Sequence, residues 1–431
     1  MLLVLFVILL AMIFAGLPIL LAMGLVGLAG FLTQHDLVLA LYPQKMFTTL
    51  DSFSLLALPY FILAGELMAK GGISGRLVQF AQTLVGHLRG GLAQASIVAS
   101  MVFAGISGSS TADTSAIGSV LIPAMKKHGY RPGFAAAVTA TAGTIGAIIP
   151  PSMTMIVYGA LANVSIGGLF LGGIIPGILV GFALMTVVYL HALNSGTYPE
   201  LQARTGRFDW RATVRSLVRV WSALLAPLII VGGILGGIFT ATEAGVVACV
   251  YSFLISVVFY RTIKLSELPR ILLDAALTTC MVSGIIGIAG AFGWLLAYLD
   301  FNDIILGAIL GVTHEPVLVF GMLVAIMLVL TMFVDSMAVM IIMVPIAVFI
   351  GSRLGIDQFQ LGVAIVMATQ IGATTPPVAV LLFVASSIAK CTYGETIRYV
   401  WPFIAAEIAI LILVILFAPL ASWIPTWAFG S

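Results

Sequence analysis

The chain has 431 residues, of which 61% are hydrophobic and 8% are charged. Soluble domains carry about 25% charged residues, so this composition excludes a soluble globular protein. The net charge of +2 gives no indication of a nucleic-acid partner, and we expect none. Because apolar runs recur along the whole length, we expect one all-α domain whose surroundings are the lipid bilayer.

Ten apolar runs are candidate membrane spans, since a spanning helix needs about 20 apolar residues. The N-terminal run has no basic segment ahead of it, as a cleaved signal peptide would have, so we expect it to stay in the membrane. A break near Gly16 and Pro18 separates the first two runs. In chain order the candidate spans are 2–15, 17–33, 53–69, 133–163, 168–192, 220–240, 243–260, 271–299, 358–389 and 398–424.

Two further apolar regions are interrupted by polar residues and predict helical hairpins that enter and leave the membrane on the same side. The first hairpin, 91–125, carries the polar string Gly105–Ser115 at its tip. The second hairpin, 316–351, has its polar tip at Thr331–Ser336. In the first hairpin, the second arm at 115–125 is too short to cross the membrane.

Basic residues are divided unevenly between the two ends of these spans. One end receives 16 of the 18 lysines and arginines, and the other receives only Lys45 and Arg353. Since short loops rich in Lys and Arg stay in the cytoplasm, the first end is predicted to be cytoplasmic and both termini external. The stretch 193–219 carries five arginines and is expected to be a solvated cytoplasmic linker between two halves.

The two halves repeat one spacing pattern. Asp113 lies ten residues before Pro123, and Asp335 lies ten residues before Pro345. The heptapeptides at 145–151 (IGAIIPP) and 371–377 (IGATTPP) agree at five of seven positions. Because the hairpins enter from opposite faces, the repeat is inverted, which is typical of secondary transporters with a site at the membrane midplane. The predicted divisions are a first repeat 1–192 (scaffold 1–85, hairpin 91–125, broken helix 133–163) and a second repeat 220–431 (scaffold 220–299, hairpin 316–351, broken helix 358–389).

Each proline pair should unwind its helix, because two backbone donors are lost and the rings clash with the preceding turn. Unwound backbone is tolerated at membrane depth only where it lines a cavity or is buried in protein. The freed carbonyl groups are hard oxygen ligands that suit a small cation. The alternative is an ordinary proline kink whose carbonyls are satisfied by neighbouring helices.

The first hairpin tip combines hydroxyl groups with one acid, Asp113. A carboxylate inside the membrane is a functional hypothesis by default, and with hydroxyls and carbonyls it suits sodium. Asp335 repeats this theme in the second tip, although both aspartates could simply cap helices. Thr154 and Ser165, which follow the first break, are further candidates for the site. Motifs of the P-loop, HExxH and GxSxG types are absent from the sequence, so we expect no enzyme.

Several motifs together resemble the large membrane subunit of the tripartite ATP-independent periplasmic (TRAP) transporters. The likeness covers nearly the whole chain. The motifs are GHLRGG at 86–91, FAGISGS at 103–109, AD at 112–113, IPAM at 122–125, GY at 129–130, IIPPS at 148–152, FTATE at 239–243 and GATTPP at 372–377.

The resemblance implies a transporter of the bacterial inner membrane, coupled to Na+ and working as an elevator. It implies a separate small four-helix membrane subunit, a periplasmic substrate-binding protein, and an organic acid such as sialic acid or a dicarboxylate as substrate. The implied sodium ligands are Ser107, Ser109, Gly146 and Pro150 in one set, and Asp335, Gly372, Thr375 and Pro376 in the other. The implied substrate contacts are Ser109, Ser110, Thr111, Asp113, Thr154, Ser165, Thr374 and Thr375.

Two other functions are compatible with the same residues. A stand-alone divalent-anion/sodium symporter shares the hairpin plan and would need no binding protein. A channel or passive pore would show no saturation and no dependence on a sodium gradient.

Overall fold

The computed structural model of the chain describes residues 2–34, 37–193, 208–301, 304–305, 307, 311 and 313–430. Helices are the only regular secondary structure in these residues, so the predicted all-α class is confirmed. Within the described part of the chain, six helical segments are long and apolar enough to cross a membrane. They are Ile166–Leu193, Trp210–Leu235, Ala241–Phe259, Leu265–Tyr298, Ser336–Arg353 and Tyr393–Leu416.

Fewer segments reach spanning length than the ten predicted because several predicted spans are broken into shorter helices. The first two runs form α1 (Leu2–Phe14) and α2 (Ile19–Thr33), which are separated by Gly16 and Pro18. The run at 53–69 forms a short 3-10 turn, η1 (Phe53–Leu56), and then α4 (Ala57–Lys70). Two helices have no counterpart in the predicted spans, α3 (Leu41–Leu50) and α5 (Ile73–Val85).

Helices α4, α12 (Ala241–Phe253) and α13 (Leu268–Tyr298) form one side of the molecule, where α4 packs on α12 and α13. Helix α13 also packs on α2 and α3. A π-helical segment, η4 (Leu254–Phe259), continues α12, and the 3-10 turn η5 (Leu265–Glu267) leads into α13.

The predicted linker 193–219 is shorter than expected. Residues 194–207 lie outside the described part of the chain, but α11 (Trp210–Leu235) begins ten residues before the predicted span. Asp209 caps this helix by accepting a hydrogen bond from the Arg211 N–H at 2.9 Å. The buried residues Thr213 and Ser216 lie on one face, so the arginines occupy the other face of a helix.

The predicted span 398–424 is wrong at its C-terminal end. Helix α19 (Tyr393–Leu416) ends before Pro419, and a separate helix, α20 (Pro419–Phe429), starts there. A proline is well tolerated in the first turn of a helix and poorly in its interior, which explains the break. Helix α10 (Ile166–Leu193) packs against both α19 and α20.

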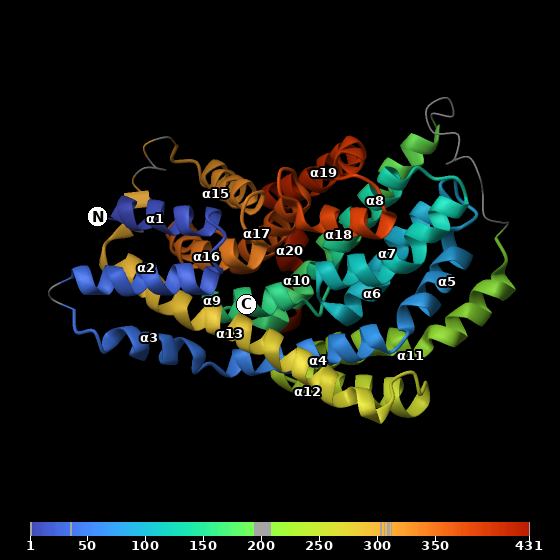
Figure 1. Cartoon of the computed structure of the whole chain (residues 1–431), viewed down its shortest axis with the longest axis horizontal. Helices are drawn as coiled ribbons and strands as arrows, with labels where there is room; N and C mark the ends of the chain where they lie inside the picture. Colours follow the sequence, from blue (N-terminus) through green and yellow to red (C-terminus); the bar gives the residue numbers. More distant parts are fainter. Residues whose placement is uncertain are drawn as a thin grey trace.

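The two hairpins are formed by α6 (Gly91–Ser107) with α7 (Ser110–Lys127), and by α15 (Pro316–Thr331) with α16 (Ser336–Arg353). They lie toward opposite ends of the long axis of the molecule (Figure 1). The first packs on α8 and the second on α17. The broken helices are α8 (Pro132–Thr144), η2 (Ile145–Ala147) and α9 (Met153–Ala162) in one half, and α17 (Gln358–Thr374) and α18 (Val380–Ala389) in the other.

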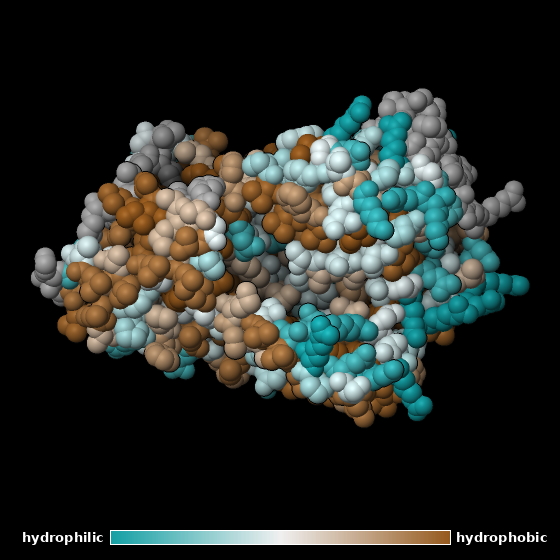
Figure 2. All heavy atoms as spheres, viewed as in Figure 1, coloured by the Kyte–Doolittle hydropathy of each residue, from teal (hydrophilic) through white to brown (hydrophobic). Residues whose placement is uncertain are grey.

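Charge is concentrated at one end of the long axis. Hydrophilic side chains gather around the outer ends of α5, α7 and α11, whereas hydrophobic side chains predominate at the other end (Figure 2). The exposed residues Lys127, Arg215 and Arg219 belong to these helices. This is the pattern expected when one end of the spans faces the cytoplasm.

Candidate functional site

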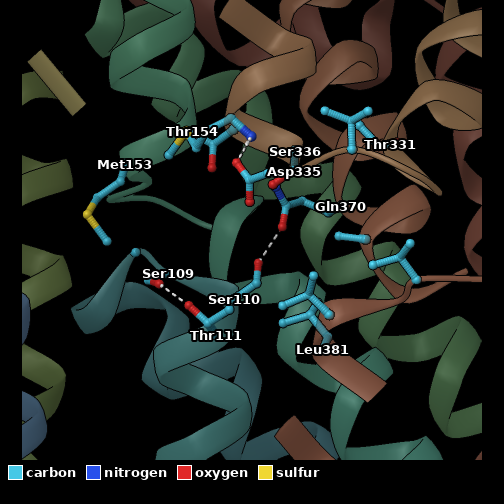
Figure 3. A pocket seen from close by; sticks show the side chains of 16 residues that line it. Ser109, Ser110, Thr111, Met153, Thr154, Thr331, Asp335, Ser336, Gln370 and Leu381 are labelled. Carbon is cyan, nitrogen blue, oxygen red and sulfur yellow. Dashed lines mark hydrogen bonds between the residues drawn. The ribbon is translucent and has the colours of Figure 1, made fainter. Parts of the chain in front are cut away.

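One cavity of about 140 Å³ lies where both hairpin tips meet both helix breaks. Its walls come from segments far apart in the sequence, and the side chains of Ser110 and Gln370 point toward one another across it (Figure 3). The lining residues are Gly108, Ser109, Ser110, Thr111, Met153, Thr154, Thr331, Val334, Asp335, Ser336, Met337, Gln370, Ala373, Val378, Val380 and Leu381.

Each hairpin tip is bonded to the break of its own half through the backbone. The carbonyl of Gly108, at the end of α6, accepts a hydrogen bond from the N–H of Met153 at 3.1 Å. In the second half, the carbonyl of Met332, at the end of α15, accepts one from the N–H of Val378 at 3.2 Å. In both halves the carbonyl belongs to the C-cap residue of the first hairpin arm, and the N–H belongs to a residue just after the proline pair.

Gly108 is required at the first tip for two reasons. Its φ of +65° lies in the left-handed region, which favours glycine. A Cβ at this position would also lie 2.5 Å from the carbonyl oxygen of Pro151, which is backbone and cannot move aside. The tip and the break therefore approach more closely than any side chain would allow.

The hydroxyl groups of the first tip have different partners. Ser109 is the N-cap of α7 and accepts a hydrogen bond from the N–H of Ala112 at 3.5 Å. Its hydroxyl also lies 3.2 Å from that of Thr111. Ser110 donates a hydrogen bond of 2.6 Å to Oε1 of Gln370, the dashed line that joins the two halves in Figure 3.

Gln370 was not among the predicted site residues. It is a polar side chain in the long apolar run of α17, directly before the repeated heptapeptide that starts at Ile371. Polar residues inside a membrane-spanning run are rare and usually have a partner or a function, so its position was a usable signal.

Asp113 lies behind the lining of the cavity, with no exposed surface. Capping does not account for it, because Ser109 is the N-cap of α7. Its Oδ1 accepts a hydrogen bond from the Ser107 hydroxyl, and its Oδ2 has no hydrogen-bond partner within the described part of the chain. Gly146 of the first break lies directly against Oδ2, and a Cβ there would overlap it. The carboxyl group thus faces the first break.

Asp335 occupies the corresponding place in the second half but does cap its helix. Its Oδ1 accepts hydrogen bonds from the N–H groups of Met337 at 3.0 Å and Ala338 at 3.4 Å. It lines the cavity directly, unlike Asp113. Gly372 lies against the hydroxyl of Thr331, so a glycine of the break again touches a polar group of the hairpin.

The structure separates the remaining predicted residues. Thr154 lines the cavity, whereas Thr374 and Thr375 donate hydrogen bonds to the Ile371 carbonyl at 2.8 and 2.7 Å, and neither lines it. Ser165 caps α10, accepting from the Gly168 N–H at 3.2 Å. It borders a different cavity of about 450 Å³ beside residues 237–243. The predicted ligands Ser107, Gly146, Pro150, Gly372 and Pro376 also lie outside the lining of the 140 Å³ cavity.

Comparison with known proteins identifies the family. The family model of the tripartite ATP-independent periplasmic transporter, DctM component, matches residues 6–420. The chain belongs to the DctM family. It is therefore a subunit of a membrane transporter and not an enzyme.

Named relatives agree with this family assignment. The C4-dicarboxylate TRAP transporter large permease protein DctM of Pseudomonas aeruginosa is 38% identical over 93% of this chain and 93% of its own length. The sialic acid TRAP transporter large permease protein SiaM of Vibrio cholerae is 34% identical over 98% and 97%. The isethionate TRAP transporter permease protein DctMQ of Oleidesulfovibrio alaskensis is 38% identical over 92% of this chain, but the chain spans only 62% of that protein.

Two solved structures share the fold of this DctM-family chain at 13% sequence identity. The Alcanivorax borkumensis YdaH transporter has a TM-score of 0.57, with 86% of this chain and 87% of that chain covered. Neisseria gonorrhoeae MtrF has a TM-score of 0.59, with 91% and 84% covered. At this identity the likeness concerns the fold alone.

Proposed function

We propose that the chain is the translocation subunit of a sodium-coupled TRAP transporter that imports an organic acid across the bacterial inner membrane. The observation that carries this proposal is the single cavity built from both hairpin tips and both breaks. A site shared between inverted repeats is the arrangement that secondary transporters use.

The lining of the cavity suits a small, polar, oxygen-rich molecule. It offers the hydroxyl groups of Ser109, Thr111 and Thr154 together with the amide of Gln370. Among the described residues that line it, none is Lys, Arg or His. An organic anion bound there needs positive charge from another source, because an uncompensated charge is costly to bury.

Sodium ions that travel with the substrate are the source we propose. The buried carboxyl of Asp113, with one oxygen unpartnered beside Gly146, is the strongest candidate to hold one. An unpaired buried carboxylate is expensive, whereas a carboxylate that contacts a cation is not. We assign Asp113 to the sodium rather than to the substrate, since it lies behind the lining. Asp335 and the second break offer the matching position.

Movement is proposed to follow the elevator scheme, in which the hairpins and broken helices cross the membrane together. The backbone bonds from Gly108 to Met153 and from Met332 to Val378 support this, because they tie each tip to its own break. A separate four-helix membrane subunit and a periplasmic binding protein complete the proposed assembly.

The test is uptake into proteoliposomes. The chain would be reconstituted with its small subunit, and a radiolabelled organic acid supplied with and without the binding protein and an inward sodium gradient. Saturable uptake that needs both the gradient and the binding protein supports the proposal. Full uptake without the binding protein would favour a stand-alone divalent-anion/sodium symporter, and unsaturable uptake would indicate a pore.

A further inference from the structure

A second buried acid, Glu407 of α19, lies outside the cavity and has no role in the function proposed above. Only 1% of its surface is exposed. In the described residues it forms no ion pair, and its Oε2 has no hydrogen-bond partner. Its Oε1 lies at hydrogen-bond distance from the hydroxyl of Thr144, the last residue of α8 before the first break.

The hydrogen-bond count at Thr144 decides where a proton must lie. The Thr144 hydroxyl oxygen is 2.6 Å from the carbonyl oxygen of Thr141 and 2.6 Å from Oε1 of Glu407. Both neighbours are acceptors if Glu407 is ionised, yet a hydroxyl has one hydrogen to donate. One of these two short oxygen–oxygen contacts would then hold no hydrogen at all.

A proton on Oε1 of Glu407 removes this conflict. Glu407 then donates to the Thr144 hydroxyl oxygen, and Thr144 donates to Thr141. The acid also becomes neutral, which is the form that a buried, unpaired carboxyl group favours strongly. Asp113 differs, because the Ser107 hydroxyl donates to its Oδ1 while accepting from the Ser109 N–H at 3.3 Å, so this contact does not require a proton on the acid.

Charged and titratable groups near Glu407 are few. Helices α8, α15, α17, α18 and α20, which pack on α19, carry none within their bounds. Helix α10 carries Tyr189 and His191, and His191 stacks on Phe403, one turn before Glu407, with ring centroids 6.0 Å apart. On α19 itself the nearest cation, Arg398, is nine residues away, roughly 13 Å along the helix. The other titratable residues of α19 are Tyr393, Glu395 and Tyr399.

We propose that Glu407 and Thr144 form a proton-binding site inside the membrane, which holds α19 against the end of α8 beside the first break. The ligand is a single proton, taken from water and carried on Oε1. Deprotonation leaves a buried anion and one hydroxyl hydrogen for two acceptors, so Thr144 can keep its bond to Glu407 only by giving up its bond to the Thr141 carbonyl. The contact between the two helices, and with it the support of the first break, therefore depends on the bound proton.

Infrared spectroscopy of the purified chain in detergent tests this directly. The carbonyl band of a protonated carboxyl group is expected at neutral pH, shifted in heavy water and lost in Glu407→Gln. The variant should still fold, because the glutamine amide can donate to Thr144 in the same place. The matched control is Glu66→Gln, since Glu66 is half-exposed and pairs with Lys70 at 3.4 Å, so its loss should leave the band unchanged.

A second variant keeps the test independent of how well Glu407→Gln folds. Thr144→Val removes the acceptor while Glu407 stays, so the band should persist but move to higher frequency. A band that survives in Glu407→Gln, or that does not move in Thr144→Val, would overturn the proposal. The spectra need no substrate, sodium or partner protein, so their outcome is separate from that of the transport assay.

Discussion

Two carboxyl groups at matching sequence positions have different environments. Asp335 is held by two backbone N–H groups at the start of α16, whereas Asp113 is fully buried with one free oxygen. The ten-residue spacing to Pro123 and Pro345 predicts their equivalence, but not this difference. The difference arises because α7 starts at Ser110, three residues before its aspartate, while α16 starts directly after Asp335.

Replacing Asp113 by Asn should lower sodium-driven uptake about tenfold or more, a factor that corresponds to about 1.4 kcal/mol of binding free energy. The reason is that an amide keeps the shape of the side chain but removes its charge. Initial uptake rates over a series of sodium concentrations measure the effect. The control is Asp357→Asn, because Asp357 caps α17 and asparagine caps equally well. Wild-type sodium dependence in Asp113→Asn would refute the assignment.

The bond between Ser110 and Gln370 should behave as a coupled pair. Ser110→Ala and Gln370→Ala should each cost about 1–3 kcal/mol of unfolding free energy, because each leaves a buried polar atom without its partner. The double variant should cost no more than the larger single loss, since contacting residues are not additive. Denaturant unfolding in detergent measures all three. Strict additivity would mean that the two side chains act independently.

At the scale of elements, the close approach of the first tip to its break can be tested by replacing glycine with alanine. Gly108→Ala should lower the melting temperature and abolish uptake, because the new Cβ meets the Pro151 carbonyl oxygen at 2.5 Å. Gly129→Ala is the matched control, as Gly129 also has a positive φ, +86°, but no neighbouring atom of the described residues lies within 4 Å of the place its Cβ would take.

Both variants share the cost of the left-handed backbone, about 1 kcal/mol. If Gly108→Ala lowers the melting temperature more than Gly129→Ala does, the difference comes from the steric contact between the tip and the break. Equal melting temperatures for the two variants would show that the contact relaxes without cost.

The ends of helices could be predicted from the sequence where polar residues or prolines interrupt an apolar run. The tips near Gly108 and Asp335 and the breaks at the proline pairs are examples. Helices α3 and α5 were missed, because each is too short and too polar to stand out as a span. The start of α11 was missed because its arginines resemble a linker, although every third or fourth residue is buried.

Within the site, sequence could indicate which residues are polar at membrane depth but not which of them face the cavity. Thr154 and Ser165 gave the same signal, yet one lines the cavity and the other caps α10. Gln370 belongs to the site because it accepts a hydrogen bond from Ser110, which is 260 positions away in the sequence. A contact of this separation follows only from how the two halves pack.

At the scale of the whole molecule, the uneven distribution of charge predicts a single orientation. In a variant whose three native cysteines are replaced by serine, Arg211→Cys should react with a membrane-impermeant thiol reagent only in inside-out vesicles. Lys45→Cys should react only in right-side-out vesicles. Labelling of both positions from the same side would contradict the predicted topology.

A substitution of Arg211 also tests whether the start of α11 is needed for transport. Because it is exposed at the start of α11, Arg211→Ala should leave uptake within about twofold of wild type. Uptake of the same labelled acid, normalised to the amount of protein in the membrane, measures this. A complete loss would mean that the segment before α11 does more than carry solvated charge.

The frame that joins each tip to its break consists of main-chain atoms, with Gly108 bonded to Met153 and Met332 to Val378. Side chains that face the cavity, such as Thr111 and Thr154, take no part in these two bonds. Substitutions there can change the shape and polarity of the cavity without breaking the two backbone hydrogen bonds. Selectivity for a new acid could thus be acquired by a few side-chain changes, and an engineered change of cargo should begin at these positions.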